Sequence, residues 1–171
     1  MPPSWRGYNR GALGGAGELG AESARAAPGY VWTYDFVKTY TRDGVPVRVL
    51  NVLDKFTRVA VAVHIARSIG SRVVLMVLEK AFEVPGRPKI IRSDNGSEFI
   101  GALVVDRLGE LGVRCALVEK ASPQQNPFIE SYHSSMRDEL LNGELFHSVT
   151  EARVVITAWV EAYTTTGHTE I

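Results

Sequence analysis

Alternating apolar and polar positions divide most of the chain into short predicted strands and amphipathic helices. The segment Y-V-W-T-Y-D-F-V-K is rich in aromatic and β-branched residues, and the turn sequence T-R-D-G-V-P follows it. Two more segments of the same kind come next, so the pattern predicts an antiparallel meander of three strands. The predicted strands are Tyr30–Lys38, Val47–Leu53 and Arg58–Ile65.

After this meander, helical and extended segments alternate. Apolar residues recur with a helical period in four segments, and two short apolar segments between them are predicted strands. The predicted helices are Ser71–Phe82, Glu98–Leu111, Phe128–Asn142 and Thr150–Tyr163, and the predicted strands are Lys89–Ser93 and Val113–Val118. This order is typical of an α/β domain in which a five-stranded mixed sheet is flanked by helices.

The first 29 residues differ in composition from the rest of the chain. Sixteen of them are glycine, alanine or proline, and such a segment buries little apolar surface. We therefore predict a flexible Gly/Ala-rich tail over residues 1–29 and a single domain over residues 30–171.

Composition narrows the class of protein. The chain has one cysteine, Cys115, which excludes an internal disulfide bond and a zinc site built from cysteines. No apolar run approaches the ~20 residues that a membrane helix needs, and the N-terminus lacks the apolar core of a signal peptide. We therefore expect a cytoplasmic protein with no membrane partner.

The charges are balanced overall but unevenly distributed. The chain has 19 basic and 19 acidic residues, whereas a strong stand-alone nucleic-acid binder is usually basic. Basic residues dominate positions 36–92 and acidic residues dominate positions 93–171. This asymmetry is compatible with a basic surface beside an acidic site, with a paired dimer face, or with chance variation along the sequence.

Three acidic residues occupy unusual positions. Asp35 lies inside the first predicted strand, where aspartate is disfavoured, and its neighbours Tyr34 and Phe36 are expected to face the opposite side of the sheet. Asp94 ends the fourth predicted strand in S-D-N-G-S-E-F, at the edge where open α/β sheets bind ligands. Glu130 falls in the first turn of the third predicted helix, beside its apolar stripe.

Three converging carboxylates repel one another unless a cation lies between them. A site of oxygen ligands alone suits Mg²⁺ or Mn²⁺ rather than zinc, and two such ions ~4 Å apart can promote phosphoryl transfer. Each carboxylate taken alone also has a structural interpretation: Asp35 at a sheet edge, Asp94 in a turn, and Glu130 at a helix N-terminus. The pattern by itself leaves both interpretations open.

Four blocks of sequence, in this order, resemble the integrase core of bacterial insertion-sequence transposases, which are similar to retroviral integrases. The blocks are V-W-T-Y-D-F-V, V-R-V-L-N-V-L-D-K-F-T-R, P-G-R-P-K-I-I-R-S-D-N-G-S-E-F and S-P-Q-Q-N-P-F-I-E-S-Y-H-S-S-M-R-D-E-L-L-N. Thirty-five residues separate Asp94 from Glu130, which matches the spacing in that family. The resemblance covers residues 30–163.

The resemblance implies roles for individual residues. It assigns a metal-binding catalytic triad to Asp35, Asp94 and Glu130, with Mg²⁺ or Mn²⁺ as cofactor and two ions expected. The family's basic residue seven positions after its glutamate corresponds to Arg137, which is expected to hold a DNA phosphate. A surface ion pair is the structural alternative for Arg137. Further candidate DNA contacts, argued from their positions near Glu130, are Gln124, Gln125 and His133. The structural alternatives are a solvated loop for the two glutamines and a space-filling role for the histidine.

The resemblance also implies a fold and an activity. The fold is ribonuclease H-like, and the expected reaction is metal-dependent cleavage and joining of DNA strands, the chemistry of transposition. The expected partners are transposon ends and target DNA, with a homodimer, a higher oligomer or a full-length transposase as protein partner. Such a protein is expected near the bacterial nucleoid.

Two departures from the family pattern keep other functions open. The segment before Tyr30 does not resemble a helix-turn-helix, and the chain ends Y-T-T-T-G-H-T-E-I where the family continues with Y-N-x-x-R-P-H. We therefore expect a core fragment or truncated copy, whose alternative function is to dimerise with or inhibit a full-length transposase. A nuclease acting on RNA–DNA hybrids is a third candidate.

Several residues receive structural predictions only. Pro127 is expected at the first position of a helix, and Cys115 is expected to be a small buried residue. Trp32, Trp159 and Phe146 are predicted to belong to the core. None of the four histidines, His64, His133, His147 and His168, shows paired metal spacing.

Overall fold

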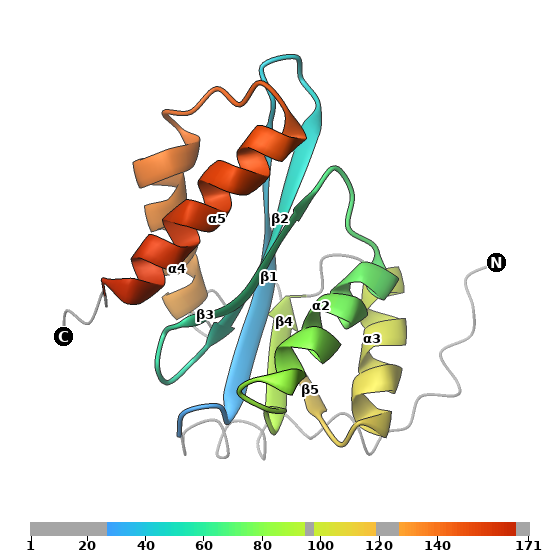
Figure 1. Cartoon of the computed structure of the whole chain (residues 1–171). Helices are drawn as coiled ribbons and strands as arrows, with labels where there is room; N and C mark the ends of the chain where they lie inside the picture. The colour runs from blue at the N-terminus through green and yellow to red at the C-terminus, as the bar shows by residue number, and fades with distance from the viewer. Residues whose placement is uncertain (1–26, 95–97, 119–126, 167–171) are drawn as a thin grey trace.

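The computed structural model describes residues 27–94, 98–118 and 127–166. Five strands form one sheet in the order β3-β2-β1-β4-β5 (Figure 1). The strands are β1 (Val31–Tyr40), β2 (Pro46–Asp54), β3 (Ala60–Ala66), β4 (Ile90–Asp94) and β5 (Arg114–Val118). β1, β2 and β3 pair antiparallel, whereas β4 pairs parallel with both β1 and β5. The predicted meander and the mixed sheet are therefore confirmed.

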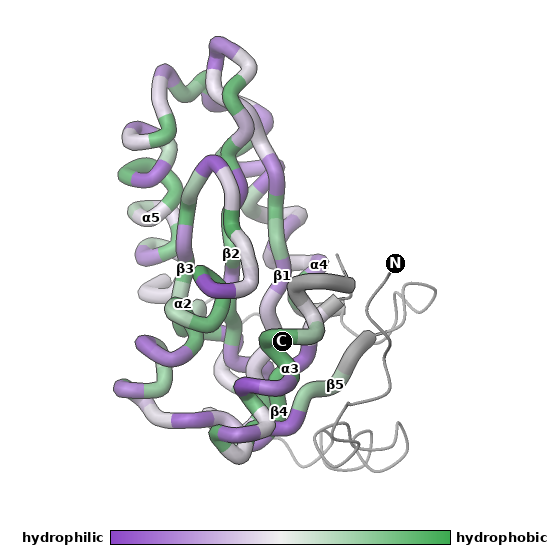
Figure 2. The backbone as a smooth tube through the Cα atoms, turned by 90° about the vertical axis from the view of Figure 1, so that its right-hand side faces the viewer, coloured by the Kyte–Doolittle hydropathy of each residue, from purple (hydrophilic) through white to green (hydrophobic). Residues whose placement is uncertain are grey.

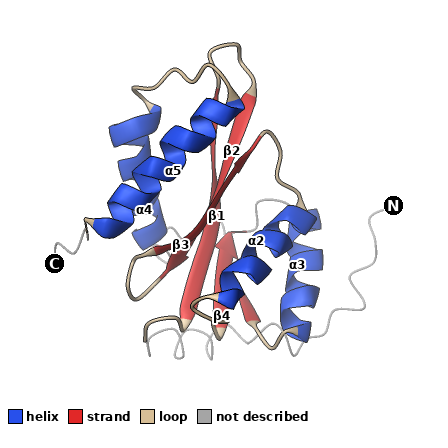
Figure 3. Ribbon diagram, viewed as in Figure 1, coloured by secondary structure: helices blue, strands red, loops and turns tan. Residues whose placement is uncertain are grey.

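Helices cover both faces of this sheet (Figure 3). The helices are α2 (Ser71–Glu83), α3 (Glu98–Glu110), α4 (Pro127–Met136), the π-helix η2 (Arg137–Leu141) and α5 (Val149–Thr165). One core cluster joins the sheet to α2 and α3, and a second joins it to α4, η2 and α5. No helix among these described segments is long and apolar enough to cross a membrane.

The core follows the periodicity of the sequence. On β1, Tyr34 and Phe36 pack with the α2 and α3 side, while Val37 packs with α4 and α5, as the alternation of a strand requires. On α5, the buried residues recur every fourth position at Ala152, Ile156 and Val160. The hydropathy colouring therefore alternates along this helix (Figure 2).

Most single-residue predictions of burial hold. Trp32 and Phe146 are fully buried and Cys115 is 3% exposed. Trp159 is only partly buried, because its ring lies at the margin of the second cluster and its Nε1 donates a hydrogen bond to Glu139 Oε2. Pro127 is the first residue of α4, as expected for a residue without a backbone N–H.

One predicted element has a different geometry. The segment predicted as a single helix over Phe128–Asn142 is an α-helix that continues as a π-helix from Arg137. Leu140 and Leu141 are consecutive, yet both are buried. A π-turn holds one residue more than an α-turn, and here it accompanies the burial of two neighbouring leucines on the side of the core.

Candidate active site

Asp35 lies in the middle of the central strand β1, directly opposite Asn51 of β2. Its side chain is 32% exposed, and its Oδ2 is 3.7 Å from Nδ1 of His133. Its Oδ1 accepts a hydrogen bond of 2.7 Å from the backbone N–H of Phe36. The carboxylate is thus half-buried, hydrogen-bonded at one oxygen and close to the His133 ring at the other, on the side of the sheet that α4 covers.

Asp94 is the last residue of β4, the parallel neighbour of β1. The register pairs Tyr34 with Ser93, so the backbone of Asp94 comes one residue beyond this pair, next to the position of Asp35. The side chain of Asp94 lies outside the described part of the molecule. The fold therefore brings these two backbone positions together from segments about sixty residues apart.

Glu130 is exposed in the first turn of α4, the helix that packs on β1. His133 follows three residues later, so the two side chains lie on one face of the helix. Since His133 contacts Asp35, Glu130 lies one helical turn from a side chain that touches the central carboxylate. Arg137 continues this face at the end of the next turn and is exposed.

His133 belongs to a chain of polar contacts that begins at the Asp35 carboxylate and leads into the core. Its Nε2 is 3.3 Å from Nδ2 of Asn51, and the hydroxyl of Tyr132 donates a hydrogen bond of 3.3 Å to Oδ1 of Asn51. Burial, together with the positive charge of Arg137, lowers the pKa of His133 from 6.5 to about 4. The imidazole is therefore neutral at pH 7.

Comparison with protein families assigns the chain to a family. A family model described as "Integrase core domain" matches residues 25–123, more than half of the chain, and a second model with this description matches residues 111–166. The chain belongs to the integrase core domain family. Both matches include described parts of the site, namely β1 with Asp35 in the first and α4 with Glu130 in the second.

Relatives of this integrase core come from bacterial insertion elements. It is 36% identical over 80% of its length to an insertion element IS407 protein of Burkholderia multivorans, covering 50% of that protein. It is 34% identical over 82% of its length to an IS476 protein of Xanthomonas euvesicatoria, covering 40% of it. It is 26% identical to a transposase for IS904 of Lactococcus lactis, over 80% of this chain and 54% of that one. The integrase core thus spans about half the length of these relatives.

Solved structures share the fold. A chain in the structure of the simian T-cell lymphotropic virus intasome, in complex with PP2A regulatory subunit B56 gamma, superposes with a TM-score of 0.60 and 16% identity, over 75% of this chain and 47% of that one. The HTLV-2 integrase catalytic core domain in complex with magnesium gives a TM-score of 0.52 at 14% identity, over 65% and 69%. The fold is therefore ribonuclease H-like, as in retroviral integrase catalytic cores.

The donor set of the integrase core fits a hard divalent cation. Asp35 and Glu130 offer carboxylate oxygens, which Mg²⁺ and Mn²⁺ prefer. Among the described side chains, no three from histidine, cysteine, aspartate and glutamate lie close enough together to hold a metal ion. The third predicted ligand, the side chain of Asp94, is not one of those described.

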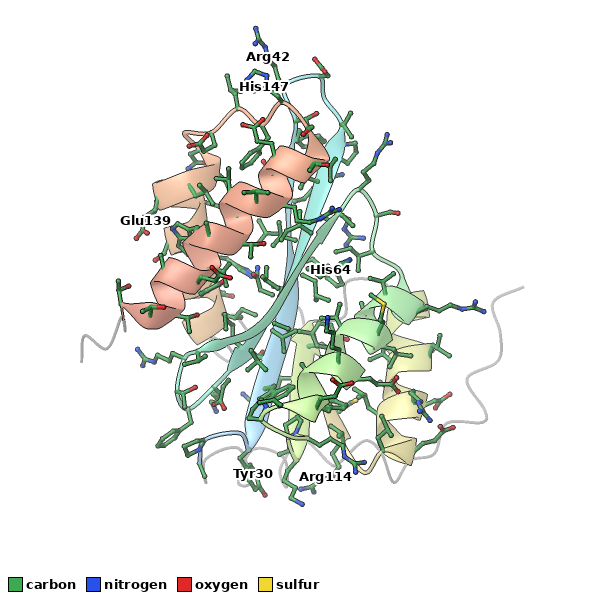
Figure 4. All side chains as sticks on the ribbon, in the orientation of Figure 1. Tyr30, Arg42, His64, Arg114, Glu139 and His147 are labelled. Atoms are coloured by element: carbon green, nitrogen blue, oxygen red, sulfur yellow. The ribbon has the colours of Figure 1, made fainter. Side chains whose placement is uncertain are left out.

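The histidines do not gather into a second metal site among the described residues. Figure 4 shows His64 at the centre of the molecule between α5 and α2, whereas His147 lies at one end beside Arg42. His168 lies outside the described residues.

Two predicted DNA contacts, Gln124 and Gln125, also lie outside the described residues. His133 is described, and its side chain is 13% exposed, with contacts to Asp35 and Asn51. Neither Asn51 nor Tyr132 was predicted to take part in the site. A signal for Asn51 was present, because it is the only polar residue in the apolar run V-L-N-V-L and a buried amide needs partners.

Proposed function

We propose that this integrase core catalyses metal-dependent cleavage and joining of DNA strands for a bacterial insertion element. Asp35, Asp94 and Glu130 would hold Mg²⁺ or Mn²⁺, most simply as two ions. The observation that carries the proposal is the position of Asp35. It lies beside the end of β4, and it is close to the face of α4 that bears Glu130 and His133. The family match and the insertion-element relatives support the choice of DNA cleavage and joining as the reaction.

The described residues indicate how the site would work. Bound divalent ions would activate an attacking oxygen and stabilise the leaving oxygen at a phosphodiester. Asp35 is fixed on the rigid central strand, which keeps its oxygens in place. Glu130 approaches from a helix and is exposed to solvent, so it is accessible to a DNA strand lying across α4.

Arg137 would bind a DNA phosphate next to these carboxylates. It is exposed and lies on the same helix face as Glu130 and His133. Among the described residues Arg137 forms no ion pair, whereas Arg107 pairs with Glu79 and Glu110. Gln124 and Gln125, which precede α4 in sequence, would contribute further DNA contacts.

The protein partners follow from the same proposal. DNA strand transfer at two element ends requires two active sites, so we propose a homodimer or a higher oligomer on element-end and target DNA. The HTLV-2 catalytic core of the same fold is described as a dimer with magnesium. The site of action would then be the bacterial nucleoid.

The test uses the whole chain with oligonucleotides copied from the ends of the element that encodes it. We expect Mn²⁺-dependent strand cleavage and joining, and a loss of at least about 100-fold in Asp35→Asn, Asp94→Asn and Glu130→Gln. Asp43→Asn, in the exposed β1–β2 turn, is the control and is expected to be as active as the wild type. Equal activity of the wild type and Asp94→Asn would overturn the proposal.

A further inference from the structure

A continuous set of contacts runs from helix α5 to the central carboxylate. Tyr132 packs against Trp159 and Tyr163 of α5, with ring centroids 5.6 and 5.0 Å away. Its hydroxyl reaches Asn51, which reaches His133. His133 in turn lies against Asp35. Of these contacts, only the last touches a residue of the proposed triad.

We propose that Asn51 and Tyr132 hold the His133 ring with its Nδ1–H toward Asp35, making His133 a positioning residue for the metal-binding carboxylate. This inference rests on the proposed function, because it takes Asp35 to be a metal ligand. It assigns Asn51 and Tyr132 a role in the active site, although both residues are buried in the core.

The donor and acceptor groups of Tyr132 and Asn51 determine the orientation of the His133 ring. Oδ1 of Asn51 accepts from the Tyr132 hydroxyl, so the group that Asn51 turns to His133 is its amide N–H. An amide N–H is a donor, and Nε2 of His133 must therefore be the acceptor. A neutral imidazole with an accepting Nε2 carries its proton on Nδ1. This is the nitrogen that faces Asp35.

The position of Asp35 follows from two donors on its two oxygens. Oδ1 accepts from the N–H of Phe36 at 2.7 Å. The Nδ1–H of His133 points at Oδ2 over 3.7 Å, which is longer than a direct hydrogen bond, and contacts of this kind tighten when the site is loaded. Once this contact closes to a hydrogen bond, the two donors together would limit rotation of the carboxylate. The ring donates without adding a positive charge that would compete with a cation.

The support behind the ring is rigid. Asn51 and Tyr132 are both fully buried, and Asn51 is fixed on β2 as the cross-strand partner of Asp35. Tyr132 is held on the other side by an edge-to-face contact with Tyr163. Partners that orient a ligand from behind typically change metal affinity 10–100-fold when they are removed.

The first experiment measures Mn²⁺ affinity of the whole chain without DNA, by water-proton relaxation titration. We expect His133→Leu to weaken binding by about 10-fold or more. His133→Asn, whose amide N–H replaces Nδ1–H, is expected to stay within about threefold of the wild type. Tyr132→Phe is expected to fall between them. Ser131→Ala, an exposed position on the opposite side of α4 from His133, is the control.

A merely structural role would lower the melting temperature of His133→Leu without changing Mn²⁺ affinity in the folded protein, and that result would overturn the inference. Equal losses in His133→Asn and His133→Leu would overturn it as well, since the donor would then be irrelevant. A wild-type chain that binds no Mn²⁺ would also overturn it, together with the metal site. Mn²⁺ binding that depends on His133, without any reaction on DNA, would support the inference and contradict only the proposed function.

The second experiment identifies the tautomer directly and needs no metal. Long-range ¹H–¹⁵N correlation spectra of the wild type at pH 7 should show the His133 proton on Nδ1. Tyr132→Phe should broaden or shift these signals, because the Asn51 amide loses the hydroxyl that fixes its orientation. A proton on Nε2 in the wild type would overturn the proposed arrangement whether or not the protein is active.

Discussion

Asp35 and Asn51 face each other across β1 and β2, and His133 of α4 contacts both side chains. A histidine 82 residues after Asn51 in the sequence thus joins two neighbouring strand positions. Because one nitrogen of the ring meets an amide and the other meets a carboxylate, the protonation state of His133 affects both the core and the site. The first prediction follows from this position.

The stability of the fold should decrease as the pH falls, with His133 as a main cause. In the unfolded chain a histidine takes up a proton near pH 6.5, whereas in the fold burial lowers the pKa of His133 to about 4. Between these values the unfolded state binds more protons, so acid favours unfolding. Going from pH 7 to pH 5, His133 should reduce the free energy of unfolding by about 2 kcal/mol.

Urea denaturation of the wild type and of His133→Asn at the two pH values isolates this contribution, because all other titrating groups are common to both proteins. The wild type should lose about 2 kcal/mol more than the variant. Parallel pH dependences of the two proteins would show that His133 has the same pKa in the folded and the unfolded chain, as an imidazole exposed to solvent would.

The second prediction concerns the core under α5. Ile156 is fully buried in the cluster that joins α5 to the sheet, whereas Val154 on the same helix is 66% exposed. Ile156→Ala should reduce the free energy of unfolding by about 2–5 kcal/mol, because it leaves a cavity. Val154→Ala should change it by less than about 0.5 kcal/mol. Chemical denaturation measures both, and similar losses would contradict the packing of α5 described here.

The strands and most helices could be predicted because their periodicity is local. The alternation Tyr34, Asp35, Phe36 places the aromatic rings on one face and the carboxylate on the other, and the structure confirms it. The π-helix could not be predicted in this way. The apolar residues of this segment fit an ordinary α-helix, and nothing in their spacing distinguishes a π-turn from Arg137 to Leu141.

The candidate site was only partly accessible to sequence reasoning. Spacing and family resemblance predict Asp35, Asp94 and Glu130 as a triad, and the triad stays a prediction. Asn51 was missed, because a single sequence gives the face of a strand but not the residue that packs on it from a distant helix. His133 was chosen for its nearness to Glu130, yet its described contacts are with Asp35 and Asn51.

The third prediction tests the start of α5. Ser148 is the N-cap of this helix, and its Oγ accepts a hydrogen bond of 3.0 Å from the N–H of Glu151. The Glu151 carboxylate accepts in return from the N–H of His147 at 2.9 Å. Ser148→Ala should therefore cost about 1 kcal/mol of unfolding free energy. Thr150→Ala, at an exposed position in the same turn, is the control, and an equal loss there would show that the cap is not responsible.

The last prediction concerns Cys115 on β5. The side chain is 3% exposed, and burial raises the pKa of its thiol to about 12. Because the thiolate is the reactive form, the folded protein at pH 8 should react very slowly with a disulfide reagent such as Ellman's reagent. In urea above the unfolding midpoint the same thiol should react within seconds to minutes. Cys115 is the only cysteine, so the absorbance change reports on this position alone. Fast reaction of the native protein without denaturant would mean that β5 separates readily from β4, which its parallel pairing with β4 from Arg114 to Val118 argues against.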